Sequence, residues 1–320
     1  MKMLQQTSIE QARKRIEPYI KRTPLEKSTA LSDRVGTNVY VKYELFQKTG
    51  SFKVRGAFNK LLSLSEEERA NGVVAVSGGN HAQAVAFASR VLGADAVIVM
   101  PDNTPQNYVD ATRGYGATVD LQPSIAAAFE KIDDYKAAGR SFVHPFDDEV
   151  VMAGQGTLGL EILEDCPEVT DVIVSIGGGG LMGGVSTAIK SKRPEVRIWG
   201  VETLGADAMA QALEAGKPVT LPAITSIAKT LGAPAVSETT LELAQKNLES
   251  VTVVTDAEAV ETLNFIAERL KVITEPAASC TLAAAEKVKI NFNSNSNVVL
   301  IFCGGNTSLS DISHYLQNTK

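Results

Sequence analysis

The stretch Asp171-Val-Ile-Val-Ser-Ile-Gly-Gly-Gly-Gly-Leu-Met-Gly-Gly184 decides how this chain folds. It opens with an apolar, β-branched run, continues with four consecutive glycines, and passes into a helical pattern at Leu181. A strand that leads through glycines into a helix leaves backbone N–H groups free to receive an anion. The segment therefore predicts a buried strand, a phosphate-binding loop and a helix. Tight packing of the helix on the sheet, with nothing bound, is the alternative interpretation.

The same alternation of a short apolar run and a longer helical pattern recurs on both sides of this stretch. Continuous apolar strands between amphipathic helices are typical of a parallel sheet covered on both faces. We expect an α/β fold of two lobes with a cleft between them, in which residues 72–146 form a small domain and residues 1–71 and 147–320 form a large domain. The expected strands are Val73–Val76, Ala96–Met100, Thr118–Leu121, Asp171–Ile176, Val196–Val201 and Asn297–Phe302, and the expected helices include Asn80–Leu92, Ser124–Ala138 and Leu181–Lys190.

Composition excludes several classes of protein. The 320 residues are 44% hydrophobic and 21% charged, with a net charge of −6, so neither a disordered chain nor a binder of nucleic-acid phosphates is expected. No run of apolar residues is long enough for a membrane span, and the first residues lack a signal-peptide core. Cys166, Cys280 and Cys303 stand far apart, which predicts neither disulfides nor zinc and favours a reducing, cytoplasmic compartment.

The glycines also match a competing motif. Gly178, Gly180 and Gly183 fit G-x-G-x-x-G, and Glu202 follows about twenty residues later, as a dinucleotide-binding fingerprint requires. An NAD-dependent oxidoreductase is therefore one alternative function.

Two further segments carry polar groups of catalytic type. Ser51-Phe-Lys-Val-Arg-Gly-Ala57 contains Lys53, and Ser77-Gly-Gly-Asn-His-Ala-Gln83 contains Asn80. Taken singly, Lys53 is an ordinary surface lysine and Asn80 an ordinary helix cap.

Together with four later motifs, these segments resemble the serine/threonine dehydratase family of fold type II enzymes, which use pyridoxal phosphate (PLP) and include the serine racemases. The resemblance runs from about Thr23 to Leu309 and implies two lobes of twisted, mostly parallel sheet, like the β subunit of tryptophan synthase, with PLP in the cleft. The later motifs are HPFD at His144–Asp147, AGQGTLGLEI at Ala153–Ile162, SIGGGGL at Ser175–Leu181 and CGGN at Cys303–Asn306.

The resemblance implies roles for residues around the cofactor. Lys53 would form the Schiff base with PLP and act as the catalytic base, Phe52 would pack beside the ring, and Asn80 would hydrogen-bond the phenolic oxygen. Cys303 would face the pyridine nitrogen, and Gly232 would lie against one face of the ring. The phosphate would be bound by backbone N–H groups of Gly177, Gly178, Gly179, Gly180 and Leu181.

The implied reaction eliminates water from L-serine, L-threonine or a related β-hydroxy amino acid, and the dehydrated product then hydrolyses to a 2-oxo acid and ammonia. Ser77, Asn80 and His81 would receive the substrate carboxylate. A lysine beside a cofactor loses its proton more easily when buried, which suits Lys53 to this chemistry. A neutral Cys303 thiol supports the ring nitrogen only weakly, which suits prompt elimination. A homodimer is the family expectation.

The sequence departs from its relatives at informative positions. Serine racemases carry a serine where this chain has Gly78, and asparagine where it has Phe146, which favours elimination over racemisation. Cysteine synthases, which perform β-replacement, commonly have threonine where this chain has His81. Racemase and β-replacement synthase therefore stay as alternatives with less support.

A divalent-cation site in some relatives would correspond to Glu202, the carbonyl of Ala206 and the side chain of residue 208. Residue 208 is alanine here, although Asp207 is adjacent, so a metal is possible but not favoured. Glu275 opens a helix close to the expected site. It would either help to position the cofactor ring or interact with the helix dipole.

Overall fold

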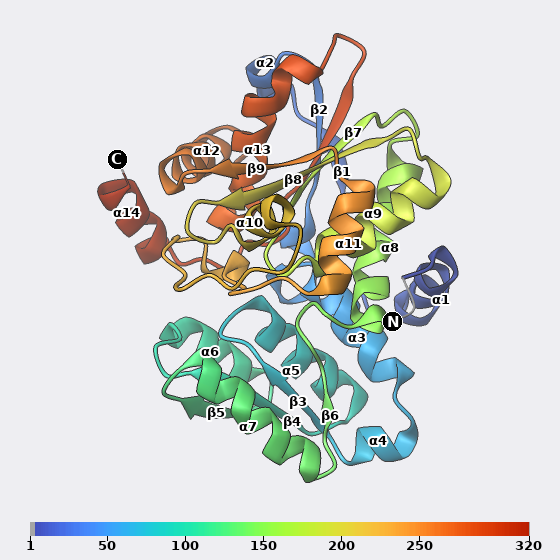
Figure 1. The fold of residues 1–320 in the computed structure, drawn as a ribbon, viewed down its shortest axis with the longest axis vertical. Coiled ribbons are helices and arrows are strands. Elements are labelled where there is room, and N and C mark those ends of the chain that lie inside the picture. Colours follow the sequence, from blue (N-terminus) through green and yellow to red (C-terminus); the bar gives the residue numbers. More distant parts are fainter. Residues whose placement is uncertain (1–3, 320) are drawn as a thin grey trace.

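The computed structural model describes residues 4–319, and within them the strands form two separate sheets, one in each half of the molecule (Figure 1). The larger sheet contains, in spatial order, β1 (Leu25–Lys27), β2 (Asn38–Lys42), β10 (Asn297–Ile301), β7 (Asp171–Ser175), β8 (Arg197–Thr203) and β9 (Ser250–Val254). The smaller sheet contains β5 (Thr118–Gln122), β4 (Ala96–Pro101), β3 (Val73–Val76) and β6 (Ser141–Phe142). Neighbouring strands pair in parallel, except that β1 runs antiparallel to β2.

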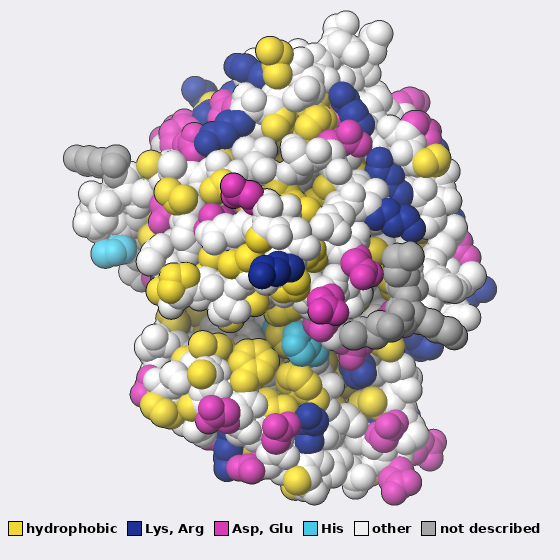
Figure 2. All heavy atoms as spheres, viewed as in Figure 1, with side chains coloured by type: hydrophobic (Ala, Val, Ile, Leu, Met, Phe, Trp, Pro, Cys, Tyr) yellow, Lys and Arg dark blue, Asp and Glu magenta, His cyan; other side chains and the backbone are white. Residues whose placement is uncertain are grey.

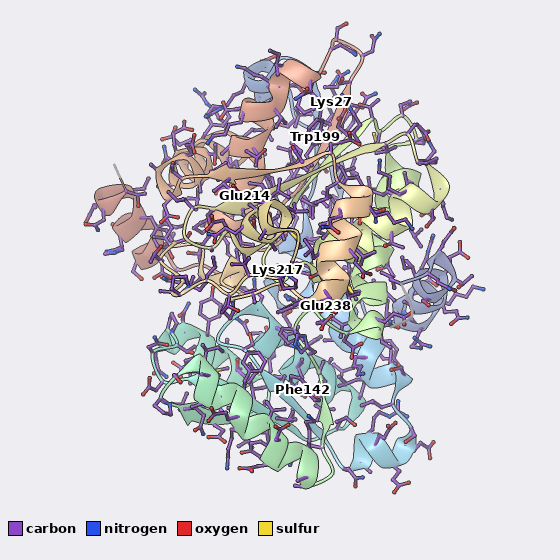
Figure 3. The ribbon with its side chains drawn as sticks, viewed as in Figure 1. Lys27, Phe142, Trp199, Glu214, Lys217 and Glu238 are labelled. Carbon is purple, nitrogen blue, oxygen red and sulfur yellow. The ribbon has the colours of Figure 1, made fainter. Side chains whose placement is uncertain are left out.

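The mostly parallel α/β fold predicted from the sequence is therefore confirmed. Every residue of β3 and of β7 is buried, as expected for strands covered on both faces. On β8, Trp199 donates from Nε1 to Oδ1 of buried Asp171 on β7 at 2.8 Å, which ties the two strands in register. Figure 3 labels Trp199 in the half that holds the larger sheet and Phe142 in the half that holds the smaller one.

Helices cover both sheets (Figure 1). Gly93, Gly116 and Gly139 follow three of them with positive φ angles of 67°, 95° and 88°, so the helix ends predicted at these glycines are present. The α-helices are α1 (Gln6–Ile16), α2 (Thr29–Val35), α3 (Lys53–Ser63), α4 (Glu66–Ala70), α5 (Asn80–Leu92), α6 (Gln106–Gly114), α7 (Ile125–Ala137), α8 (Glu149–Asp165), α9 (Gly180–Lys192), α10 (Ala208–Ala215), α11 (Glu238–Asn247), α12 (Asp256–Leu270), α13 (Pro276–Val288) and α14 (Leu309–Asn318). Short 3₁₀ turns lie at η1 (Glu44–Phe46), η2 (Lys48–Gly50), η3 (Lys229–Leu231) and η4 (Lys289–Asn291).

The two sheets have separate hydrophobic cores that share a border at α3. The strands of the smaller sheet all lie between residues 73 and 142. Its core, however, also contains Phe58 from α3 and Val151 from α8, which lie outside the segment 72–146. The boundaries proposed from the sequence stay a prediction, since side chains from both assigned domains fill one core.

A buried ion network fixes the start of α3. The guanidinium of Arg55, with no exposed surface, makes ion pairs with Glu44 at 2.8 Å and with Glu161 at 2.6 Å. Lys42 on β2 reaches the same Glu161 at 2.7 Å. Because buried charges are tolerated only when they are paired, this network holds α3 against η1 and α8. The first residue of α3 is Lys53.

Candidate active site

A cavity of about 500 Å³ lies between the two halves and contains the lysine predicted to be catalytic. Its volume falls within the range typical of small-molecule sites. Both sheets contribute loops to it, mostly from the carboxyl ends of strands, as is usual in open α/β folds. On the outer face, hydrophobic side chains gather along the junction of the halves (Figure 2). Ile125 and Phe129 of α7 belong to the lining and are 40% and 36% exposed.

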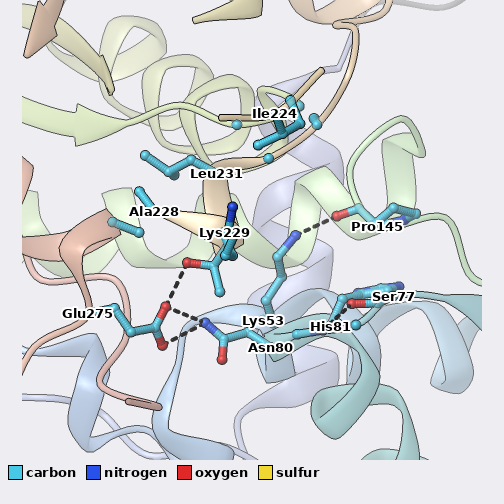
Figure 4. A pocket seen from close by; sticks show the side chains of 18 of the residues that line it. Lys53, Ser77, Asn80, His81, Pro145, Ile224, Ala228, Lys229, Leu231 and Glu275 are labelled. Carbon is cyan, nitrogen blue, oxygen red and sulfur yellow. Dashed lines mark hydrogen bonds between the residues drawn. The ribbon is translucent and has the colours of Figure 1, made fainter. Parts of the chain in front are cut away.

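Lys53 extends from the start of α3 into this cavity (Figure 4). Its Nζ donates a hydrogen bond to the carbonyl oxygen of Pro145 at 2.7 Å and lies 5.3 Å from the ring centroid of Phe52. Burial lowers the pKa of Lys53 to about 8, an effect that the nearby Cys303 only partly offsets. A substantial fraction of this amine is therefore neutral near physiological pH, as a nucleophile or base requires.

The glycine run divides into two parts with different tasks. Gly177, Gly178, Gly179, Gly180 and Leu181 all line the cavity. Gly179 is the N-cap of α9 with φ of 94°, and no side chain caps that helix. A Cβ on Gly178 would lie 2.1 Å from the ring of Phe146, so only glycine fits there. The uncapped start of α9 is thus open to an anion such as a phosphate.

Gly183 and Gly184 lie one turn further along α9 and serve packing instead. A Cβ on Gly184 would lie 2.3 Å from the carbonyl oxygen of Met152 and 2.6 Å from the backbone nitrogen of Gly156, both on α8. A Cβ on Gly183 would meet the Leu243 side chain at 3.0 Å. This second pair packs α9 against the neighbouring helices α8 and α11, whereas the alternative interpretation had the helix packing on the sheet. The G-x-G-x-x-G match therefore combines glycines that line the cavity with a glycine that packs between helices.

Asn80 and Glu275 both line the cavity, and hydrogen bonds join them across the two halves (Figure 4). Asn80 Nδ2 donates to both carboxylate oxygens of Glu275, at 2.9 and 3.1 Å. The same carboxylate accepts from Thr230 Oγ1 at 2.7 Å and from the backbone N–H of Asn306 at 2.8 Å. Asn306 Nδ2 donates in turn to Asn80 Oδ1 at 2.8 Å. Glu275 makes no capping bond to α13, so its side chain serves the site rather than its own helix.

Burial raises the pKa of Glu275, while its hydrogen-bond donors act in the opposite direction. The sequence singled out Glu275 without assigning it these partners. The contribution of Asn306 was missed, although the CGGN motif contained it. The contacts of Glu275 and of Asn306 follow no periodic pattern in the sequence, because they join loops that are distant in the chain.

Ser77 and His81 lie in the same loop and helix start as Asn80, but their side chains already have hydrogen-bond partners in the protein. Ser77 Oγ accepts from the backbone N–H of Gly79 at 3.0 Å. The His81 Nε2 atom bonds the carbonyl oxygen of Val143 at 2.9 Å, and burial lowers the pKa of His81 to about 3. A neutral imidazole gives a substrate carboxylate no charge to bind. The carboxylate-binding role of Ser77, Asn80 and His81 stays a prediction that rests on the uncapped start of α5.

Cys303, Phe52 and Gly232 also line the cavity. The Cys303 thiol is buried, donates to the carbonyl oxygen of Ala277 at 3.5 Å, and has a pKa raised well above its usual value by burial. It is therefore a neutral group, as the resemblance requires for weak support of a ring nitrogen. The individual cofactor contacts of these three residues stay predictions.

The structure does not support the cation site considered at Glu202 and Ala206. Glu202 is fully buried, and its two oxygens accept from the backbone N–H groups of Met209 and Ala210 at 2.9 and 2.8 Å. Burial raises the pKa of Glu202 to about 8, and no group of three or more His, Cys, Asp or Glu side chains within residues 4–319 is placed to hold a metal. Nor is Glu202 exposed to a nucleotide ribose. Its carboxyl group holds the first turn of α10 instead.

Comparison with known proteins identifies the cofactor chemistry. A family model described as pyridoxal-phosphate dependent enzyme matches residues 16–304. The chain belongs to this family. The residues present fit PLP, since an amine with a lowered pKa and an uncapped glycine loop face one cavity. The predicted PLP dependence is confirmed, and the NAD-dependent oxidoreductase alternative is wrong.

Particular relatives refine this result. The chain is 40% identical to an L-threonine ammonia-lyase of Thermotoga maritima, over 97% of this chain and 77% of that protein. It is also 40% identical to a catabolic L-threonine dehydratase of Staphylococcus aureus, over 97% and 91%. The solved structure of maize serine racemase matches with a TM-score of 0.93 and 37% identity, covering 99% of this chain and 98% of that one. These likenesses confirm the predicted family of fold type II enzymes and the predicted lyase of the ammonia-lyase type.

Proposed function

We propose that this enzyme eliminates water from L-threonine and L-serine, and that the dehydrated products then hydrolyse to ammonia and 2-oxobutanoate or pyruvate. The observation that carries the proposal is the position of Lys53. Its amine, with a pKa of about 8, lies in one cavity with the uncapped starts of α9 and α5. The two helix starts offer separate sites for two anions, a cofactor phosphate and a substrate carboxylate. The relatives named for threonine ammonia-lyase support the choice of substrate.

The chain's own residues perform three tasks in this reaction. Gly177 to Leu181 would hold the phosphate, and Lys53 would hold the cofactor aldehyde until the substrate amine replaces it. PLP, when bound, delocalises the electron pair left on the substrate α-carbon. Lys53 Nζ, then free, accepts the α-proton, and the β-hydroxyl leaves as water with a proton that the cofactor phosphate would supply. The Cys303 thiol, kept neutral by burial, would support the ring nitrogen only weakly, which favours prompt elimination.

Replacement of Lys53 provides the direct test. Lys53→Ala should lower 2-oxo acid release from L-threonine by about a thousandfold or more, because the general base is lost. Lys217→Ala, at an exposed lysine outside the cavity, is the matched control and should keep wild-type activity. Borohydride reduction should leave an adduct at position 53 in the wild type and in Lys217→Ala, but not in Lys53→Ala. Equal turnover by the two variants would disprove the proposal.

Serine racemisation is the second candidate, favoured by the likeness to maize serine racemase. Gly78 has no side chain to act on the opposite face of the substrate. We expect pyruvate to form from L-serine much faster than D-serine does. Comparable rates, measured by chiral chromatography and 2-oxo acid assay, would favour the racemase. β-Replacement has less support, because this chain has His81 where cysteine synthases commonly have threonine.

None of the helices in residues 4–319 has the length and apolar character of a membrane span. A cytoplasmic location and a homodimer stay our expectations, the first from cysteine usage and the second from the family. Sedimentation analysis of the holoenzyme would test the second.

A further inference from the structure

Gly78 and Thr104 compete for the same space at the edge of the small sheet. A Cβ built on Gly78 would lie 2.6 Å from Oγ1 of Thr104 and 3.4 Å from its Cγ2. The two residues follow β3 and β4, which are adjacent and parallel, so both loops lie at one end of the sheet. The glycine at position 78 thus makes room for the threonine that reaches across from the neighbouring loop.

The hydroxyl of Thr104 is available to a ligand. Thr104 is half-buried and lines the cavity together with Lys53, Ser77 and Asn80. The structure shows no hydrogen-bond partner for this hydroxyl within residues 4–319, whereas Ser77 Oγ is already bonded to a backbone N–H group. The backbone N–H of Thr104 donates to the carbonyl oxygen of Pro101 at 3.0 Å, which holds the loop in a turn.

The position of the hydroxyl indicates which part of a substrate it meets. Gly78 and Gly79 lead into α5, a helix of 13 residues that has no side-chain cap. An uncapped helix start attracts a negatively charged group, and the substrate's anionic group is its carboxylate. A hydroxyl placed over this loop would meet that carboxylate as a hydrogen-bond donor.

We propose that Thr104 is a substrate-binding residue, whose hydroxyl donates a hydrogen bond to the carboxylate of the bound amino acid. The proposal rests on the function proposed above and adds to it a contact from a loop outside the predicted carboxylate-binding segment. Gly78 is then required because any larger residue displaces this hydroxyl.

Two matched variants test the contact. Thr104→Val keeps the side-chain shape and removes the hydroxyl, while Thr104→Ser keeps the hydroxyl. A hydrogen bond to a charged group is worth about 1.5–3 kcal/mol, so Thr104→Val should raise the KM for L-serine and L-threonine about ten- to a hundredfold. Its kcat should change less than its KM. Thr104→Ser should stay within about threefold of wild type in both constants.

L-Serinamide separates a carboxylate contact from a general disturbance, because it lacks the negative charge. Its apparent affinity, measured by spectral titration of the holoenzyme, should be alike in wild type and Thr104→Val. An equal loss of affinity for L-serine and L-serinamide would overturn the proposal. A fall in D-serine formation at unchanged KM would overturn it too, because the hydroxyl would then act on the α-carbon.

A second pair of variants tests the role of Gly78. Gly78→Ala should raise KM as strongly as Thr104→Val, and adding Gly78→Ala to Thr104→Val should raise it little further, since both remove the same contact. Fully additive effects would contradict this account.

The yellow colour of the holoenzyme should persist in every variant. A wild-type holoenzyme that neither binds nor converts any β-hydroxy amino acid would overturn the proposed function as well, whereas a fully active Thr104→Val variant would overturn only this inference.

Discussion

Glu275 and Glu202 are both carboxylates buried at the start of a helix, and burial raises the pKa of each. Glu202 accepts only backbone N–H groups of the helix that follows it. Glu275 accepts from Asn80, Thr230 and Asn306, which come from three separate segments that line or border the cavity. Burial and a shifted pKa therefore do not by themselves mark a functional acid. What distinguishes the two residues is where their hydrogen-bond donors come from. The carboxylate of Glu275 organises the site because its donors come from several segments around the cavity, whereas that of Glu202 only caps the start of a helix.

Of the two carboxylates, Glu275 is expected to have the larger effect on catalysis. Glu275→Ala should lower kcat/KM for L-threonine about a hundredfold, because Asn80, Thr230 and the Asn306 backbone lose a shared acceptor and the cavity loses its order. Glu275→Gln keeps an acceptor oxygen and should lose less. Steady-state kinetics on samples of equal PLP content measure kcat/KM for both variants. Wild-type kinetics in Glu275→Ala would show that Glu275 does not organise the site.

Glu202→Ala should instead act on stability. It leaves two backbone N–H groups of α10 without acceptors and should lower the free energy of unfolding by about 1–3 kcal/mol. Activity per folded molecule should stay within about threefold of wild type, because Glu202 does not line the cavity. Denaturant unfolding and kinetics on the same preparation give both values. A selective loss of activity would place Glu202 in the same class as Glu275.

The pH dependence of stability should reveal Glu202 separately. Burial raises the pKa of its carboxyl group from the ordinary 4.5 to about 8, so the folded state binds more protons than the unfolded chain between these values. The stability contributed by the protonated form is full below pH 4.5 and is lost as pH rises through about 8. Glu202→Gln should therefore show a flatter decline of melting temperature over this window. A decline as steep as that of wild type would contradict the assignment.

Added cations should have the smallest effect. Because both oxygens of Glu202 are already engaged, millimolar Mg²⁺ or Ca²⁺ should shift the melting temperature of the holoenzyme by less than about 1 °C. EDTA should leave the kinetics unchanged. A stabilisation that disappears in Glu202→Gln would restore the cation site that the sequence suggested.

These contrasts also show what the sequence could and could not predict. The strands beginning at Val73 and Asp171 and the helix Asn80–Leu92 carry strong local patterns, and the structure places all three where they were expected. Lys53 and the glycine loop belong to motifs that combine residue type with spacing. The partners of Glu275, the bond between Asn306 and Asn80, and the contact of Thr104 with position 78 join loops from different strands. Such contacts depend on tertiary packing, which leaves no periodic trace in the chain.

The close fit of Gly184 against Met152 and Gly156 has a kinetic consequence. The backbones of α9 and α8 approach each other closely there, which restrains sliding or tilting of α9 on α8. The backbone N–H groups at the start of α9 are therefore preorganised before the cofactor binds. The entropic cost of ordering them is incurred when the chain folds and not when PLP binds. Apoenzyme should therefore take up the phosphate end of PLP without a slow rearrangement. Formation of the covalent bond between Lys53 and PLP would then be the rate-limiting step when the holoenzyme is formed from apoenzyme and PLP.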